Sequence, residues 1–272
     1  MRSSVADFAG ITRNTELEVN IDPKSKVKHV PENDVTIRSC HTIGEFEEMV
    51  ELEVRVWGFG ERDVVPSQMY VVAAKIGGQI LGAFVEGKMA GFVLAYPGIR
   101  DGKPYLHSHM AAVLPEFRNL GIGRKLKLAQ REDALARGIS LIEWTFDPLQ
   151  ARNAHFNLCR LGVVVRRYLL DVYGSTSSPL HAGIPTDRLV AEWYVDSPRV
   201  KDILSGKQPR REDSIQRVHI AIEDDSPEGM LAVQQAVRTH FQQLFGSGYT
   251  ATWFERGPKG GAYVLERSAI GT

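Results

Sequence analysis

The residue types and spacing that most clearly indicate chemistry occur at residues 118–123, which read Arg-Asn-Leu-Gly-Ile-Gly. This segment lies between an apolar, strand-like run and an amphipathic helix expected to open at Arg124. Gly121 and Gly123 allow the backbone to turn tightly and bring its N–H groups onto an anion, and a helix N-terminus adds roughly half a positive charge. We therefore predict a cradle for a phosphate group, most simply a pyrophosphate.

Two common phosphate-binding motifs do not fit this segment. No G-x-x-x-x-G-K-[ST] occurs in the chain, and G-x-G-x-x-G would need glycine where Leu126 stands. An ordinary strand-to-helix turn remains the alternative for the hexapeptide alone, because glycine pairs are common in such turns. Arg124, Lys127 and Arg131 follow at helical spacing on one face, which either meets phosphates or is simply solvated.

Composition limits the class of protein. The chain has 272 residues, of which 43% are hydrophobic, and its 33 basic and 33 acidic residues give a formal net charge of zero. This suits a globular protein with one large domain or two small ones. A neutral balance provides no overall field for nucleic acid or an anionic membrane, so we expect neither as a partner. Neither a long apolar run nor a signal-like N-terminus is present, and we expect a cytoplasmic location.

The chain has two cysteines, Cys40 and Cys159. They are too few for a disulfide framework or a four-cysteine metal site, and no C-x-x-C or H-E-x-x-H occurs. We expect two reduced core thiols and no metal.

The pattern of apolar residues predicts an α/β chain in the order β, α, α, β, β, β, α, β. The strands are expected at residues 35–39, 80–85, 91–95, 106–113 and 139–146, and the helices at 43–54, 66–74 and 124–138. Residues 1–33 are polar, without sustained periodicity, and suit a flexible arm.

This order, and R-x-x-G-x-G preceded by Val-Leu-Pro-Glu-Phe at residues 113–117, resembles the GNAT acyltransferases, in which the motif binds acetyl-CoA. The resemblance covers about residues 34–175. It implies a mixed, mostly antiparallel sheet flanked by helices, with acetyl-CoA or another acyl-CoA as co-substrate. The residues that it assigns to the coenzyme are Ala111, Val113, Arg118, Asn119, Leu120, Gly121, Ile122, Gly123, Arg124 and Asn153. For Asn153, which we expect to open the fourth helix, a plain helix N-cap is the alternative.

The strand before the glycine loop supplies candidate catalytic residues. By the period of two, His107, His109, Ala111 and Val113 share one face. With an ordinary pKa near 6.5, a histidine can act as a base at neutral pH, so both histidines are candidates to deprotonate an amine. A pair of hydrogen-bonded structural histidines is the alternative.

Further candidates lie on the next strand and beyond it. Glu143 and Thr145 alternate with Ile142 and Trp144, so one of these two pairs faces the crevice that opens between diverging strands in the family. The family often has a tyrosine, a proton donor to the departing thiolate, where this chain has Leu158. Tyr168 and Tyr173 are substitutes by residue type only, and each is otherwise a half-buried strand aromatic.

The chain continues beyond an ordinary GNAT domain. Strands are expected at residues 163–172 and 189–195, and the loop between them lines an acceptor pocket or is a surface connection. A β-α-β-β unit follows, whose helix is capped by Ser226 with Pro227 at its first position. This unit completes the core, covers the acceptor side, or is an incomplete second acyltransferase half. We divide the chain into the arm at residues 1–33, an acyltransferase domain at 34–196, and a linker with the C-terminal unit at 197–272.

The sequence thus predicts an N-acyltransferase that moves an acetyl or succinyl group from coenzyme A directly to the amine of a small molecule, such as an amino acid. The alternative from another class is a regulatory module of GNAT fold that binds acyl-CoA without turnover, which Leu158 supports. A nucleic-acid-binding module ranks third. Whether the chain forms a homodimer is left open.

Overall fold

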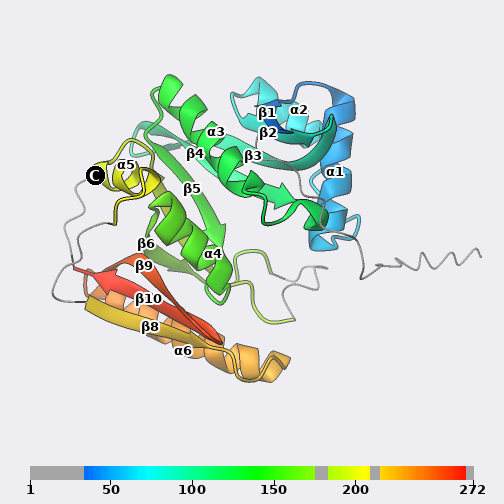
Figure 1. The fold of residues 1–272 in the computed structure, drawn as a ribbon. Coiled ribbons are helices and arrows are strands. Elements are labelled where there is room, and N and C mark those ends of the chain that lie inside the picture. Colours follow the sequence, from blue (N-terminus) through cyan, green and yellow to red (C-terminus); the bar gives the residue numbers. More distant parts are fainter. Residues whose placement is uncertain (1–33, 175–182, 209–214, 268–272) are drawn as a thin grey trace, which may run out of the picture.

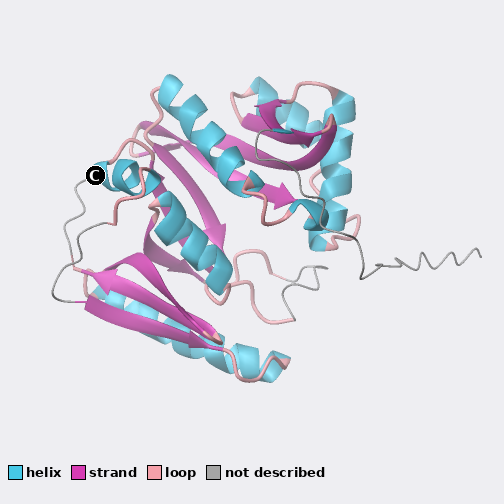
Figure 2. Cartoon of the chain, in the orientation of Figure 1, coloured by secondary structure: helices cyan, strands magenta, loops and turns pink. Residues whose placement is uncertain are grey.

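The chain folds around one large sheet. The structure, a computed structural model, describes residues 34–174, 183–208 and 215–267, so the predicted arm at residues 1–33 lies outside it. Ten strands form a single sheet, and helices pack on it (Figure 1; Figure 2). This is the α/β fold predicted from the sequence.

The strands are β1 (Val35–Ser39), β2 (Gln79–Val85), β3 (Lys88–Arg100), β4 (Lys103–Val113), β5 (Leu141–Phe146), β6 (Val164–Leu169), β7 (Arg188–Tyr194), β8 (Ile215–Ala221), β9 (Thr250–Gly257) and β10 (Gly260–Glu266). The helices are α1 (Ile43–Trp57), α2 (Ser67–Lys75), α3 (Ile122–Ala136), α4 (Ala151–His155), α5 (Pro198–Leu204) and α6 (Pro227–Gly246). A short 3₁₀ helix covers Pro115–Phe117, and a π-helical segment, Phe156–Leu161, continues α4.

The strand order is β1-β2-β3-β4-β5-β7-β6-β9-β10-β8. Among the described strands, β4 and β5 form the one parallel pair, and the other neighbours are antiparallel. The predicted mostly antiparallel sheet is therefore confirmed.

The N-terminal part of the sheet has two covered faces. On one face, Phe46 and Met49 of α1 pack with alternate residues of β2, β3 and β4. On the other, Ile122 and Leu126 of α3 pack with the intervening residues, such as Val93. This alternation follows from the period of two in a strand, and it places α1 and α2 opposite α3.

The predicted C-terminal β-α-β-β unit is present as β8, α6, β9 and β10. Ser226 caps α6 and Pro227 is its first residue, as expected. The unit joins the sheet at Val165 of β6, which pairs with Ala251 of β9. Its apolar side chains, including Phe241 of α6, belong to the same core cluster as Trp193 of β7. The unit therefore shares a continuous core with residues 141–195.

One helix was not predicted. The sequence predicts a linker over residues 197–213, whereas Pro198–Leu204 form α5. Ser197 accepts a hydrogen bond from the Val200 N–H at 3.3 Å, and Pro198 at the first helical position is a known start signal. The helix has only seven residues, too few for a clear 3.6-residue period, which is why the polar composition of the segment dominated the prediction.

No helix in the described ranges is both long and apolar enough to cross a membrane.

Candidate active site

The predicted phosphate cradle forms the connection between β4 and α3. Gly121 has φ 73°, in the left-handed region that favours glycine, and it occupies the N-cap position of α3. Among the described residues, no side chain caps this helix and no acidic residue stands in its first turn. The first N–H groups of a helix have no partner within it, so the start of α3 offers backbone donors of the kind that bind an anion. A Cβ added at Gly121 would meet nothing within 4 Å, and one at Gly123 would meet only Val113 Cγ2 at 3.9 Å.

Side chains hold this loop in shape. Arg118 Nε donates to the Val113 carbonyl at 3.4 Å, which closes the loop onto the end of β4. Asn119, at φ 68°, accepts a hydrogen bond from the Arg152 guanidinium at 2.6 Å through Oδ1. Because Arg152 belongs to α4, this contact ties the cradle to the helix that follows β5.

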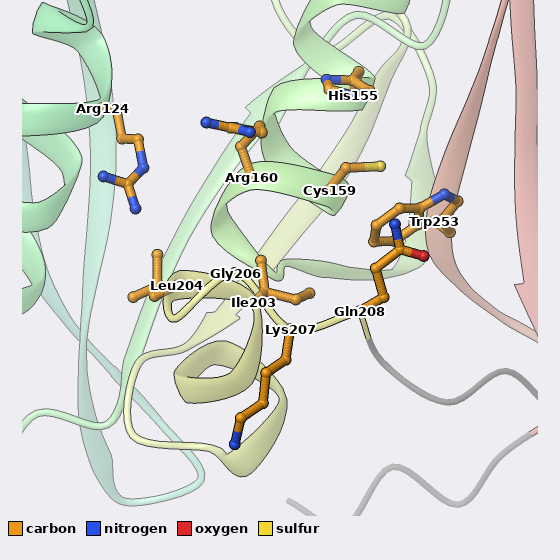
Figure 3. Close-up of a pocket in the computed structure, with 10 residues that line it drawn as sticks. All are labelled: Arg124, His155, Cys159, Arg160, Ile203, Leu204, Gly206, Lys207, Gln208 and Trp253. Atoms are coloured by element: carbon orange, nitrogen blue, oxygen red, sulfur yellow. The ribbon is translucent and has the colours of Figure 1, made fainter.

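A cleft of about 320 Å³ lies beside the cradle (Figure 3). Arg124, in the first turn of α3, forms one wall, and His155 and Arg160 come from α4 and its π-helical continuation. Trp253 of β9 and residues 203–208, at the end of α5 and just after it, complete the lining. Arg124, which the sequence placed at the cradle, and Trp253 of the C-terminal unit therefore line the same depression.

β4 and β5 diverge next to the cradle. They pair only at Leu106 with Ile142 and at His107 with Glu143. Beyond these residues β4 continues along β3 as far as Val113, whereas β5 continues along β7. The edges of β4 and β5 therefore separate toward the glycine loop, as the family resemblance implied.

A β-bulge corrects the prediction that four residues of β4 share one face. Ala95 of β3 pairs with Ser108 and Leu94 pairs with Met110, which leaves His109 unpaired in the described sheet. Ser108 contacts side chains of α3, yet Val113, five residues later, also packs on the α3 side. The extra residue thus exchanges the two faces of the strand, because a bulge shifts the alternation by one. His107 and His109 do not share a face with Val113.

The three basic residues of α3 do not form one common phosphate-facing or solvated surface. Lys127 is only 4% exposed, and its Nζ donates to Ser108 Oγ at 2.8 Å. Arg131 donates through Nε to the Val195 carbonyl at 2.7 Å. Of the three residues, only Arg124 lies beside the cradle. Helical spacing places basic residues on one side of a helix, but it does not show whether that side faces solvent or packs on the sheet.

The two histidines lie together on the side of β4 away from α3. Their ring centroids are 6.3 Å apart, and the ring of Tyr96 lies 5.8 Å from that of His109. Burial lowers the pKa of His107; among nearby charges, Glu143 opposes this and Lys127 adds to it. Burial also lowers the pKa of His109, with His107 adding to the effect. Both imidazoles are therefore neutral at pH 7, in the form that accepts a proton.

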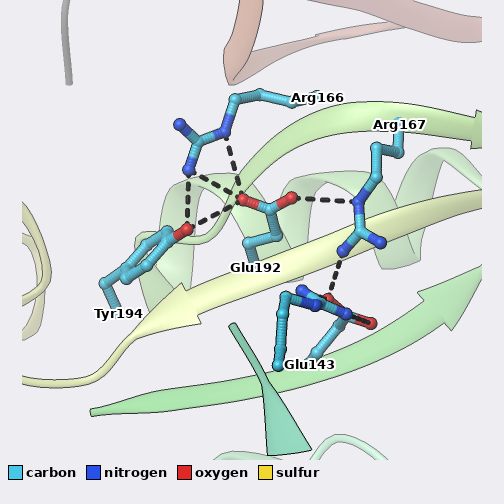
Figure 4. Close-up of polar contacts among 6 residues, drawn as sticks. Glu143, Arg166, Arg167, Glu192 and Tyr194 are labelled. Carbon is cyan, nitrogen blue, oxygen red and sulfur yellow. Dashed lines mark hydrogen bonds and ion pairs between the residues drawn. The ribbon is translucent and has the colours of Figure 1, made fainter. Parts of the chain in front are cut away.

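Glu143 is the centre of a cluster of ion pairs (Figure 4). It accepts two hydrogen bonds from Arg100, at 2.5 and 2.9 Å, and a further one from Arg167. Glu192 of β7, directly opposite Glu143, accepts from Arg166 at 2.8 Å and from Arg167 at 3.2 Å. Burial alone would raise the pKa of Glu143, but Arg100 and Arg167 hold it below its usual range.

The sequence analysis missed the arginines of this cluster. In the sequence, Arg166 and Arg167 are two charged residues inside an otherwise apolar strand pattern. A charged side chain at such a position needs a partner, and this is the one feature that indicates the cluster. The partner, Glu192, is 26 residues away in the chain, which a single sequence does not reveal.

The remaining candidates are dispersed. Asn153 is exposed in the middle of α4, which begins at Ala151, so the N-cap alternative is wrong. Leu158 is fully buried in the core. The Tyr168 hydroxyl donates to Asp187 Oδ2 at 2.8 Å, whereas the hydroxyls of Tyr173 and Thr145 lie 2.8 Å apart. Of these two tyrosines, Tyr173 is therefore the one that contacts the diverging part of β5.

In the part of the chain that the structure describes, no three His, Cys, Asp or Glu side chains gather as they would around a metal ion. Cys40 and Cys159 are both buried free thiols, as expected.

Comparison with known proteins identifies a protein family for part of the chain. Residues 46–159 match the model of the Acetyltransferase (GNAT) family. This segment contains β4, the glycine loop, α3, β5 and most of the helix that follows, which are the elements that build the cradle and the divergence. The match covers the segment whose motif resembles the GNAT acetyltransferases, as the sequence indicated.

Several solved structures resemble the chain at low identity. The ribosomal-protein-alanine N-acetyltransferase of Escherichia coli is 16% identical, with a TM-score of 0.49, over 60% of this chain and 95% of that one. Arabidopsis thaliana Naa50 in complex with a CoA bisubstrate analogue is 13% identical, with a TM-score of 0.48, over 58% and 97%. YncA from Salmonella typhimurium with acetyl-CoA is 18% identical, with a TM-score of 0.48, over 61% and 96%. No curated protein sequence matches the chain.

Proposed function

We propose that the chain transfers an acetyl or succinyl group from coenzyme A to the amine of a small molecule such as an amino acid, by direct attack in a ternary complex. The observation that carries the proposal is the uncapped N-terminus of α3 beside the divergence of β4 and β5. The residues present fit an acyl-CoA. The open space at Gly121 and Gly123 admits a pyrophosphate, and the edge of β4 beyond its pairing with β5 offers backbone groups to the pantetheine arm.

The bound acyl-CoA supplies an activated thioester, and the protein groups prepare the amine. His107 is the candidate base, because it lies where β4 leaves β5 and its pKa is lowered by burial. His109, at 6.3 Å between ring centroids, is the second candidate. Glu143 remains a candidate by position, but its carboxylate already accepts from Arg100 and Arg167, which disfavours protonation. Its geometry fits a role in orienting those arginines.

The same cluster supports an acceptor with a carboxylate. Three guanidinium groups, those of Arg100, Arg166 and Arg167, face two carboxylates, Glu143 and Glu192, which leaves an excess of one positive charge. Each of these arginine side chains is 31–39% exposed, so solvent and a small molecule can reach it. An arginine binds a carboxylate with two parallel hydrogen bonds, a geometry that suits an amino acid.

The test combines titration calorimetry with a thiol-release assay. We expect binding of acetyl-CoA or succinyl-CoA and release of free thiol with an amino acid, and a much slower release with the matched amine that lacks the carboxylate. Release with the decarboxylated amine at an equal rate would refute the carboxylate-bearing acceptor. Binding without release for any acceptor would favour the non-catalytic module, for which the buried Leu158 is the supporting observation. No binding of either acyl-CoA would refute the proposal.

A further inference from the structure

We propose that Arg100 is a positioning residue for acyl transfer: its guanidinium reaches across β4, holds the carboxylate of Glu143 beside His107, and compensates the charge of that carboxylate. The inference rests on the proposed function, because His107 is the candidate base there. Arg100 acts on the reacting amine only through Glu143 and His107. This gives the ion-pair cluster a part in the chemistry besides its proposed contact with the acceptor.

The path of the Arg100 side chain is the first argument. Arg100 is the last residue of β3, and β4 lies between β3 and β5 in the sheet. The guanidinium carbon of Arg100 lies 4.8 Å from the centroid of the Tyr105 ring on β4. Its two terminal nitrogens donate to the two carboxylate oxygens of Glu143 on β5, at 2.5 and 2.9 Å. The side chain therefore passes over β4, and the paired hydrogen bonds fix the orientation of the carboxylate.

The position of the carboxylate is the second argument. His107 of β4 and Glu143 of β5 are register partners, and theirs is one of the two pairs that join these strands before they diverge. Burial lowers the pKa of His107, and the negative charge of Glu143 opposes this effect, so that charge acts on the imidazole. A carboxylate without compensation at this place would favour the imidazolium, the form that cannot take a proton from an amine.

The carboxylate is compensated from two sides. Arg100 contacts it from β3, and Arg167 contacts it from β6 (Figure 4). The side chain of Glu143 is 7% exposed, so salt screens this group little and the guanidinium groups supply the compensation. The hydrogen bonds to Glu143 raise the pKa of Arg100 further above its high usual value. Arg100 therefore keeps its charge at every pH at which a histidine titrates.

Other titratable groups surround His107. Next to burial and Glu143, the charge of Lys127 from α3 lowers the pKa of His107, and His109 lies beside it on β4. Tyr96, its partner on β3, has a pKa raised mainly by burial and stays neutral below about pH 10. Glu192 lies one strand further away and pairs with the arginines of β6. Burial lowers the pKa of Lys127 to about 7, so its charge changes near neutral pH, whereas the charge of Arg100 does not.

The experiment measures the pKa of the His107 imidazole by NMR titration of the full chain without ligand. The resonance is identified by its loss in His107→Gln. In Arg100→Gln a positive charge is removed and Glu143 is less compensated, and both changes favour the imidazolium. We therefore expect the pKa of His107 to rise by about one pH unit, the low end of the effect of one nearby charge. In Glu143→Gln it should fall, and in the double variant it should return close to its original value.

Two further variants keep the test specific. Arg100→Lys retains the positive charge but loses the two parallel hydrogen bonds, so the pKa of His107 should stay close to that of the original chain. A pKa in this variant equal to that in Arg100→Gln would indicate a structural role and overturn the inference. Arg217→Gln, which removes an arginine of β8 that pairs with Glu255, should leave the pKa of His107 unchanged. In Arg100→Gln the buried Glu143 still has Arg167 as a partner, so we expect this variant to fold.

Kinetics connect the shift to catalysis. The pH dependence of kcat/KM reports groups of the free enzyme, so its inflection should move upward in Arg100→Gln by the same amount as the NMR value. The position of the inflection is the readout, because Arg100 also belongs to the surface proposed to bind the acceptor. An unchanged pKa of His107 in Arg100→Gln would overturn the inference and leave the proposed function in place. The expected pKa shift without thiol release for any acceptor would confirm the charge relationship and refute the proposed function.

Discussion

Lys127 Nζ lies 3.8 Å from the centroid of the Trp144 ring, between α3 and the diverging strand β5. Its hydrogen bond is to the Ser108 hydroxyl at 2.8 Å, and no carboxylate pairs with it among the ion pairs of the described chain. Burial lowers the pKa of this ammonium to about 7. The folded chain thus contains a buried amine that gains or loses its proton near neutral pH.

This relationship predicts a pH dependence of stability. The unfolded chain has an ordinary lysine with a pKa near 10.4, so between pH 7 and 10 it binds more protons at this position than the folded chain. The free energy of unfolding therefore rises with pH in that range, by at most about 1.4 kcal/mol per pH unit from this group. Lys127→Met removes the contribution. We expect the variant to be more stable than the original chain at pH 7 and the advantage to shrink by pH 9.

Thermal or urea unfolding of both proteins at pH 7, 8 and 9 measures this difference. Lys75→Met, at an exposed position in the last turn of α2, serves as the control and should not alter the pH dependence. Parallel stability curves for Lys127→Met and the original chain would contradict the prediction.

The cradle can be tested without damaging the fold. Gly123 is the second residue of α3, and an added Cβ there would meet only Val113 Cγ2 at 3.9 Å, so we expect Gly123→Leu to fold. Its stability should rise by up to about 1 kcal/mol, because glycine is a poor helix residue. The side chain would occupy the space in front of the helix N-terminus, so we expect the affinity for acetyl-CoA to fall at least tenfold, measured by calorimetry.

α1 offers a matched control. Gly44 is also the second residue of its helix, and an added Cβ there would meet nothing within 4 Å. Gly44→Leu should raise stability similarly and leave acetyl-CoA affinity unchanged. Equal affinities in the two variants would remove the cradle assignment.

The histidines give a kinetic prediction. Because burial lowers the pKa of His107, we expect kcat/KM for acyl transfer to rise with pH through an inflection below 6.5 and to be flat between pH 7 and 8. His107→Gln should lower kcat by about 10²–10⁴, the usual effect of losing a general base, and should remove the inflection. His219→Gln, at an exposed position of β8, is the control. An unchanged pH profile in His107→Gln would return this residue to a structural role, and the same test then applies to His109.

The sequence predicted the elements better than it predicted their faces. The glycine loop and the capped helix α6 follow from local signals, namely a positive-φ glycine and a Ser-Pro start. The bulge at His109 has no such signal, because it depends on how β4 pairs with β3. One unpaired residue exchanged the two faces, and so the predicted common face of His107 and Val113 was lost.

Long-range contacts were also beyond the sequence. The alternation along its strand predicts Glu143 as a catalytic carboxylate. In the structure it pairs with Arg100 and Arg167, which lie 43 and 24 residues from it in the chain and which the local pattern does not reveal. The cleft beside Arg124 likewise needs Trp253, which only the shared core brings near α4. Local patterns define strands and caps, whereas charge partners and clefts are set by packing.

The last prediction concerns the proton donor that Leu158 does not provide. Tyr173 lies at the diverging part of β5, with its hydroxyl 2.8 Å from that of Thr145, and its side chain is exposed. Tyr168 donates its hydroxyl to Asp187, and its ring packs 5.9 Å from that of Phe241 in the C-terminal unit. Of these two tyrosines, Tyr173 is the one that a substrate can reach to have its thiolate protonated.

We therefore expect Tyr173→Phe to lower kcat at least tenfold with little change in melting temperature. Tyr168→Phe should do the reverse: because it leaves Asp187, a buried carboxylate, without one of its donors, it should lower stability by about 1–3 kcal/mol and leave kcat nearly unchanged. Measuring the rate of thiol release and the melting temperature of both variants tests this prediction. Full activity in Tyr173→Phe would return this residue to a structural role, and the same test then applies to Tyr96, whose ring lies 5.8 Å from that of His109.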